Sequence, residues 1–208
     1  MIVPDMIGAL LRGEKLMPWE KKFDKAATLD RALEAFWSHG YEATSMQDLV
    51  DCMGVNRGSL YATYGDKRAL FEAALGRYDD DRRRMLSNLE ARYEPRDAIR
   101  QLFLAFTKDI DPNGGNKGCF LTNTALELAA HDPEIRALVS SAQADLEAFF
   151  KRLIVAGKDA GDIPEHVNVL DASRTLLATL LGVVVLVRSR PERALLKTIV
   201  DDALRRLG

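Results

Sequence analysis

The chain has 208 residues, of which 47% are hydrophobic and 29% are charged, and this composition excludes a disordered or low-complexity protein. The formal net charge of −2 gives no sign of a nucleic-acid partner when the whole chain is averaged. The two cysteines, Cys52 and Cys119, exclude a disulfide-stapled scaffold and fit a reducing compartment. Together with three histidines they leave little for a metal site, so we expect neither metal nor cofactor.

No segment predicts a membrane span. Residues 1–11 are apolar but include Pro4 and Asp5, and they lack the basic start and small-residue cleavage site of a signal peptide. The longest apolar run, Leu176–Val187, has twelve residues, whereas a spanning helix needs about 20. We therefore expect a cytoplasmic protein with no membrane partner, in which this run is a buried helix in the core or at a subunit contact.

Helical periodicity runs through the chain and strand signals are nearly absent, which predicts an all-α fold of about nine helices. Caps and glycines predict where the first helices begin and end. In chain order these are a helix over Phe23–His39 stopped by Gly40, a short helix opened by a Thr44/Gln47 capping box and ended by Gly54, a short helix capped by Asn56 and ended by Gly65, and a long helix capped by Asp66.

The second half of the chain is predicted in the same way. Pro95 marks a break, after which a helix runs through Ile99 to Ile110 and is followed by the loop Asp111–Asn116. The remaining helices are Cys119–Ala130, a helix from the Asp132 cap to about Ala156 ended by Gly157, Asp171–Ser189, and one from Pro191 to Leu207. We divide the chain into an N-terminal extension (1–18), a first domain (19–65) and a second domain (66–208).

The segment Thr44–Tyr64 has the spacing of a helix-turn-helix unit, with its turn at Cys52–Val55. Such a unit inserts the first turn of its second helix into the DNA major groove, where small and polar side chains let the backbone approach the bases. Gly58 costs about 1 kcal/mol inside a helix relative to Ala, so close approach is favoured over stability there. The residues that meet this demand are Asn56, Arg57, Gly58 and Ser59.

Three stretches, Gly40–Ser45, Gly54–Tyr61 and Tyr64–Phe71, resemble the DNA-binding domain of TetR-family bacterial regulators. The resemblance implies an all-helical homodimer whose N-terminal three-helix domain binds operator DNA. It also implies C-terminal helices that form an effector pocket and the dimer contact.

By position, the resemblance implies two sets of DNA-binding residues. Those of the recognition helix are Asn56, Arg57, Gly58, Ser59 and Tyr61, and those near phosphates are Thr44, with its neighbour Ser45, Tyr64 and Lys67. Residues 54–68 carry a local charge of +2, whereas Trp19–Arg68 holds seven basic and eight acidic residues, so only one edge of the domain is basic. We therefore expect moderately salt-sensitive binding.

Several of these residues have a plainer interpretation. Thr44 and Asn56 could be helix caps alone. Tyr61 and Tyr64 could be half-buried aromatics, although we expect exposed hydroxyls. We interpret Trp37 as core, and we expect the acidic and basic runs at 79–81 and 82–84 to form i,i+3 ion pairs on a solvated face.

Cys119 begins a helix after Lys117, a setting that lowers the pKa of a thiol. The stretch Gly118–Glu127 is similar to one in a subgroup of TetR-like C-terminal domains, and the resemblance implies that such a cysteine can sense oxidants or electrophiles. The alternative is a small buried hydrophobic residue. We expect Cys52 to belong to the core.

The effector pocket is weakly specified, since core packing explains each candidate equally well. The candidates are Phe103, Phe106, Cys119, Phe120, Asn123, Phe149 and Thr175. Glu127 and His131, at i,i+4, could serve a metal or form a salt-linked pair. The apolar circumference of Leu176–Val187 predicts a homodimer through the last two helices, at about residues 171–207.

The resulting hypothesis is a homodimeric, ligand-responsive transcriptional repressor. It would bind a palindromic operator in double-stranded DNA and release it when an unknown small-molecule effector binds. The alternatives are a repressor that senses oxidants or electrophiles through Cys119, an activator or adaptor with degraded DNA binding, and, more distantly, a helical-bundle enzyme. We do not expect an enzyme, because the sequence offers no nucleophile–base pair.

Overall fold

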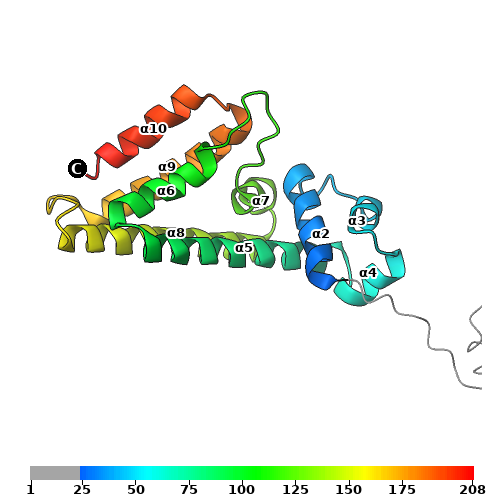
Figure 1. Ribbon diagram of the computed structural model, residues 1–208. Helices are drawn as coiled ribbons and strands as arrows, with labels where there is room; N and C mark the ends of the chain where they lie inside the picture. Colours follow the sequence, from blue (N-terminus) through cyan, green and yellow to red (C-terminus); the bar gives the residue numbers. More distant parts are fainter. Residues whose placement is uncertain (1–23) are drawn as a thin grey trace, which may run out of the picture.

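The computed structural model describes residues 24–208, and within them the chain forms nine α-helices and no strand, as predicted (Figure 1). The predicted extension 1–18 lies outside the described residues. The helices are α2 (Lys25–His39), α3 (Met46–Met53), α4 (Arg57–Tyr64), α5 (Lys67–Arg92), α6 (Pro95–Thr107), α7 (Phe120–Leu128), α8 (Pro133–Asp159), α9 (Val169–Ser189) and α10 (Arg193–Arg205).

Helices α2, α3 and α4 pack at one end of the molecule against the start of α5 (Figure 1). Their apolar faces meet in a small core, because each short helix buries one or two large side chains. The buried residues include Phe36, Leu49, Met53, Leu60 and Leu70. This packing fixes α3 and α4 while their polar faces stay outside.

The other helices form the larger unit. The long helices α5 and α8 run along its base and are joined by Arg82 with Asp145 and by Arg152 with Glu90. Helix α9 packs against α8, α6 and α10, and α7 lies between α9 and the N-terminal helices (Figure 1). Helix α5 therefore contacts both units.

Several predicted boundaries are wrong. Helix α6 ends at Thr107 rather than Ile110, α7 spans Phe120–Leu128 rather than Cys119–Ala130, and α10 spans Arg193–Arg205 rather than Pro191–Leu207. Gly157 does not end α8, which continues to Asp159. A Cβ at Gly157 would come within 2.7 Å of the Ile163 side chain, so glycine is needed here for close packing inside the helix. The last apolar helix begins at Val169 rather than Asp171, because the Asn168 side chain accepts hydrogen bonds from the next backbone amides and acts as its N-cap.

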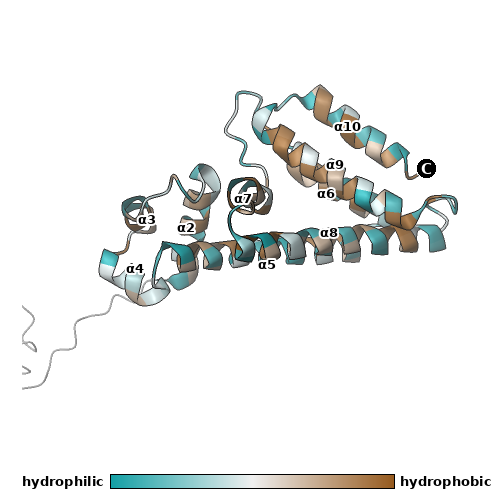
Figure 2. Ribbon diagram, turned by 180° about the vertical axis from the view of Figure 1, so that it is seen from behind, coloured by the Kyte–Doolittle hydropathy of each residue, from teal (hydrophilic) through white to brown (hydrophobic). Residues whose placement is uncertain are grey.

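Helix α9 is the one helix in residues 24–208 that is long and apolar enough to cross a membrane by length and composition (Figure 2). It buries one face against the neighbouring helices, including Leu176, Leu180 and Val183. A second face, which carries Ala178, Gly182 and Val185, is exposed. The core contact accounts for only part of its apolar surface.

Candidate nucleic-acid interface and ligand cavity

The turn between α3 and α4 has the predicted helix-turn-helix geometry. Gly54 ends α3 in the left-handed conformation, with φ 67° and ψ 31°. Asn56 then caps α4, and its Oδ1 accepts a hydrogen bond from the backbone N–H of Ser59 at 2.7 Å. The predicted cap at Asn56 is confirmed, and the side-chain amide remains exposed beside it.

The first turn of α4 faces outward. Asn56, Arg57 and Gly58 are exposed, and Ser59 is half-buried. Tyr61 is 43% exposed, and the Arg57 guanidinium lies 6.0 Å from the centroid of its ring.

Packing within the chain does not require glycine at position 58. A Cβ there would meet only Asn56 Oδ1, at 3.4 Å. This surface is small, polar and open, as an element that approaches DNA bases must be.

The predicted capping box is wrong by one residue. Ser45, not Thr44, is the N-cap of α3, and its box partner is Asp48 rather than Gln47. The Ser45 Oγ accepts from the Asp48 amide at 3.1 Å, and the Asp48 carboxylate accepts from the Ser45 amide at 2.8 Å. Two adjacent hydroxyl residues made the position ambiguous, because either can cap.

Thr44 is buried, with 2% of its surface exposed. Its hydroxyl donates to the Gly40 carbonyl at 2.6 Å. It therefore offers no free group to a phosphate in this conformation, and we remove it from the expected DNA contacts. Ser45 next to it is exposed.

Tyr64 and Lys67 lie on either side of the turn into α5. Tyr64 is half-buried, and its hydroxyl donates to the Lys25 carbonyl at 3.4 Å, so the expected free hydroxyl is corrected to a partly committed one. Burial raises the pKa of Tyr64, which keeps it protonated. The Lys67 ammonium lies 4.3 Å from the ring centroid of Tyr41 and forms no ion pair within residues 24–208.

The local charge of +2 is partly neutralised by the fold. Arg68 donates to Asp132, which caps α8, and to Glu72. The Arg68 guanidinium and two backbone amides lower the pKa of Asp132 to about 2. Arg57 and Lys67 are therefore the cations of this segment that remain available to phosphates.

Glu127 of α7 links the two units. Its carboxylate accepts from the backbone amides of Tyr41 at 3.1 Å and Glu42 at 2.9 Å, just before α3. The alternative of a salt-linked pair with His131 is wrong, because Glu127 binds these amides and forms no ion pair with the exposed His131 within residues 24–208. Sequence reasoning missed the link because it joins a side chain to amides 85 and 86 residues away.

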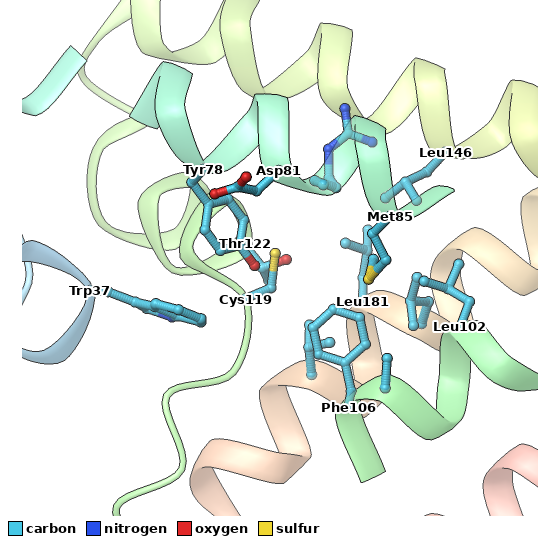
Figure 3. Close-up of a pocket in the computed structure, with 14 residues that line it drawn as sticks. Trp37, Tyr78, Asp81, Met85, Leu102, Phe106, Cys119, Thr122, Leu146 and Leu181 are labelled. Atoms are coloured by element: carbon cyan, nitrogen blue, oxygen red, sulfur yellow. The ribbon is translucent and has the colours of Figure 1, made fainter. Parts of the chain in front are cut away.

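A cavity of about 260 Å³ lies among the C-terminal helices and reaches α2 (Figure 3). Trp37 is at one end, and Leu102 and Leu146 are at the other. Its lining residues are Trp37, Tyr78, Asp81, Arg82, Met85, Leu102, Ala105, Phe106, Cys119, Thr122, Leu146, Leu180, Leu181 and Val184. A mostly apolar cavity with a few polar groups is typical of a small-molecule site.

Two of the seven candidate effector residues, Phe106 and Cys119, line this cavity. Phe103 and Phe149 are instead buried in the core. Phe120, which is also buried, lines a second depression together with Asn123, and Thr175 lines a third. The phenylalanines were chosen for size, and size alone does not distinguish a cavity wall from packed core.

Sequence reasoning missed Trp37, which was interpreted as core, and Arg82, which was interpreted as solvated. Arg82 is only 7% exposed. Its Nε donates to Asp79 at 2.7 Å and its Nη2 donates to Asp145 at 3.2 Å. The predicted i,i+3 pairing is confirmed for Arg82 and Arg84 but not for Arg83, which pairs with Asp79 and Asp145.

The two cysteines differ from each other. Cys119 is buried at the N-terminus of α7, beside Tyr78, and burial raises the pKa of Tyr78 well above its usual range. Lys117 is paired with Glu34 and lies over the Trp37 ring, 5.3 Å from its centroid. Cys52 is exposed, so its assignment to the core is wrong.

Comparison with known proteins agrees with this arrangement. Residues 29–74 match the family described as bacterial regulatory proteins, tetR family, and residues 95–201 match the tetracyclin repressor-like C-terminal domain. The chain is 33% identical over 186 residues to the uncharacterized HTH-type transcriptional regulator YezE of Bacillus subtilis (strain 168), covering 88% of this chain and 96% of that protein. It is 30% identical over 190 residues to the HTH-type transcriptional repressor ComR of Escherichia coli (strain K12), covering 89% of each.

A solved structure has the same fold. A cysteine mutant of the TetR family transcriptional regulator CifR, bound to 26-base-pair double-strand operator DNA, superposes with a TM-score of 0.77 at 25% identity, covering 89% of this chain and 97% of that one. These relatives are transcriptional regulators. The predicted family is confirmed: the chain belongs to the TetR family of bacterial transcriptional regulators.

Proposed function

We propose that the protein is a homodimeric repressor that binds a palindromic operator and releases it when a small molecule occupies the cavity. The observation that carries this proposal is the pairing of an outward-facing α4 with a cavity that reaches α2. The similarity to the repressor ComR supports the direction of regulation.

For DNA binding, the proposal assigns base and groove contacts to the exposed side of α4. These residues are Asn56, Arg57, Gly58, Ser59 and Tyr61. Ser45, Tyr64 and Lys67 flank them and would contact phosphates. Lys67 is favoured for this role because it lies in the first turn of α5, where the helix dipole adds to its own charge.

Release of the DNA would be transmitted through α7. Cys119 and Thr122, at its beginning, line the cavity, and Glu127, near its end, holds the amides of Tyr41 and Glu42. A ligand that shifts α7 would therefore move the segment before α3. In a dimer this changes the separation of the two recognition helices from the roughly 34–36 Å that one turn of DNA requires.

Two copies of the protein would pack together through the exposed face of α9 and through α10, at about residues 171–207. Ala178 and Gly182 are small enough for two helices to approach closely, and Val185 adds apolar area. A two-fold contact there would bury the side of α9 that the core leaves open.

The purified protein should bind DNA taken from upstream of its own gene. The measurement is fluorescence anisotropy at low salt against a scrambled fragment of equal length. Binding as one dimer per palindrome, with affinity falling as salt rises, supports the proposal. Equal affinity for both fragments contradicts it.

The position of Cys119 on the cavity wall favours a second candidate, a repressor that releases DNA when this thiol is oxidised or alkylated. If so, Cys119→Ser should bind the operator normally and no longer release it on mild oxidation. Release that is unchanged in this variant removes the second candidate.

A further inference from the structure

Two residues that line the cavity each carry a buried donor that no acceptor within residues 24–208 satisfies. One is the indole Nε1–H of Trp37 in α2, and the other is Nη1 of Arg82 in α5. A buried donor without an acceptor costs free energy that a bound acceptor can recover. A ligand of this cavity is therefore favoured when it brings an acceptor atom.

The charged side chains that line the cavity already form ion pairs with other residues of the protein. Arg82 pairs with Asp79 and with Asp145. Asp81, the one carboxylate on the wall, pairs with Arg77 and Arg84. Arg83, which faces the same acids, pairs with Asp79 and Asp145 and completes the balance. An anion or cation placed here would lose its hydration without a free counter-charge, which disfavours a charged ligand.

The volume of the cavity and its apolar lining residues limit the size and the polarity of the ligand. Nine of the fourteen lining residues are Trp, Met, Leu, Ala, Phe or Val. A cavity of about 150 Å³ holds benzene, so about 260 Å³ has room for a substituted ring or a small bicyclic molecule.

We propose that the effector is an uncharged, ring-sized apolar molecule with an acceptor oxygen, such as a ketone or ester, that accepts the hydrogen of Trp37 Nε1. This deepens the proposed function, on which its regulatory meaning rests. Because Trp37 belongs to α2 and the other cavity walls belong to α5–α9, this hydrogen bond joins the ligand directly to the DNA-binding unit.

The test uses three probes with one bicyclic frame: indane, indanone and indane carboxylate. Titration calorimetry with the full-length protein, without DNA, should rank indanone first. Indane, which lacks the acceptor, should bind about three- to ten-fold more weakly. Indane carboxylate should be the weakest.

Trp37→Phe keeps an aromatic ring and removes the donor. It should lose the preference for indanone over indane, so that the two probes bind equally, and circular dichroism checks that the variant is folded. The ranking in the unmodified protein does not depend on this variant.

Equal binding of indane and indanone, tighter binding of the carboxylate, or no binding of any probe at about 1 mM would overturn the proposal. None of these results requires DNA. Failure of the ligand class is therefore distinguishable from failure to bind an operator.

Discussion

Arg57 is an exposed cation at the start of α4, and it forms no ion pair within residues 24–208. If it binds a phosphate, it releases counterions, and its loss should weaken DNA binding and reduce the salt dependence together. We expect Arg57→Ala to lower operator affinity about ten-fold and to reduce the slope of log affinity against log salt by about 1. Anisotropy titrations over a series of salt concentrations measure both quantities.

The matched control for this variant is Arg84→Ala. Arg84 is also an exposed arginine, and it lies on α5, where it pairs with Asp81. Its removal changes the net charge by the same amount and should leave the slope unchanged. Equal effects of the two variants would mean that Arg57 acts only through overall charge.

Asp132 has two roles that one substitution separates. Its carboxylate caps α8 and also accepts from Arg68. Arg68 and the backbone amides of Ile135 and Glu134 together lower the pKa of Asp132 from 3.8 to about 2. Because the folded-state pKa is the lower one, the ionised carboxylate stabilises the fold above pH about 4, and this contribution is lost as the pH falls through about 2.

Asp132→Asn keeps a capping side chain but removes the charge. We expect its free energy of unfolding to fall less steeply between pH about 4 and about 2 than that of the unmodified protein. Urea denaturation at several pH values in this range tests this. Parallel pH profiles would show that the ionisation of Asp132 does not contribute to stability.

At this scale, sequence reasoning succeeds where a residue's partner is local. The Asn56 cap and the Asp132 cap depend on amides two or three residues away, and both were predictable. Arg82 was not, because its burial depends on Asp145, which is 63 residues distant. Trp37 was recognisable as apolar, but only the positions of α5–α9 turn it into a cavity wall.

The elements themselves were largely predictable because caps and glycines define helix ends locally. Asp66 caps α5 as expected, and the break predicted at Pro95 separates α5 from α6. One helix end was predicted wrongly because a glycine can either end a helix or allow close packing inside it. Gly157 was interpreted as a stop, whereas close packing against Ile163 requires it inside α8. The link from α7 to the segment before α3 left no local pattern.

That link between α7 and the DNA-binding unit is testable through Gly40. Gly40 has φ 90°, and a Cβ there would lie 2.9 Å from the Glu127 carboxylate. Gly65 has a similar φ of 85° but open space around it. Alanine is strained at both positions, whereas only at Gly40 does it also displace Glu127 from two backbone amides. We expect Gly40→Ala to cost about 1–3 kcal/mol more than Gly65→Ala in chemical unfolding.

A double-mutant cycle isolates the contribution of Glu127. In a Glu127→Ala background the difference between the two glycine variants should disappear, because no carboxylate remains to be displaced. A difference that persists would mean that Gly40→Ala acts on backbone strain alone.

At the scale of the whole molecule, the net charge of −2 implies little non-specific attraction to DNA. The fold strengthens this conclusion, because Arg68 is used internally and Arg57 and Lys67 remain. Specific contacts from two copies of α4 must then supply most of the affinity. A monomer, with one recognition helix and few free cations, should bind weakly, so DNA binding should depend strongly on dimerisation.

Two glycines that lie within helices make this dependence testable. A Cβ at Gly182 in α9 or at Gly76 in α5 meets nothing within 4 Å, so glutamate fits at either position in a single protomer. Glutamate also favours helix more than glycine does, so neither variant should lose protomer stability. If two copies of α9 pack face to face, a charged side chain at position 182 prevents their approach.

We therefore expect Gly182→Glu to be a folded monomer that no longer binds operator DNA with dimer affinity. Gly76→Glu should stay dimeric and bind normally. Light scattering after gel filtration gives the oligomeric state, circular dichroism checks the fold, and anisotropy gives the affinity. A dimeric Gly182→Glu protein would move the two-fold contact away from this face of α9, and a monomer that still binds with full affinity would contradict the requirement for two recognition helices.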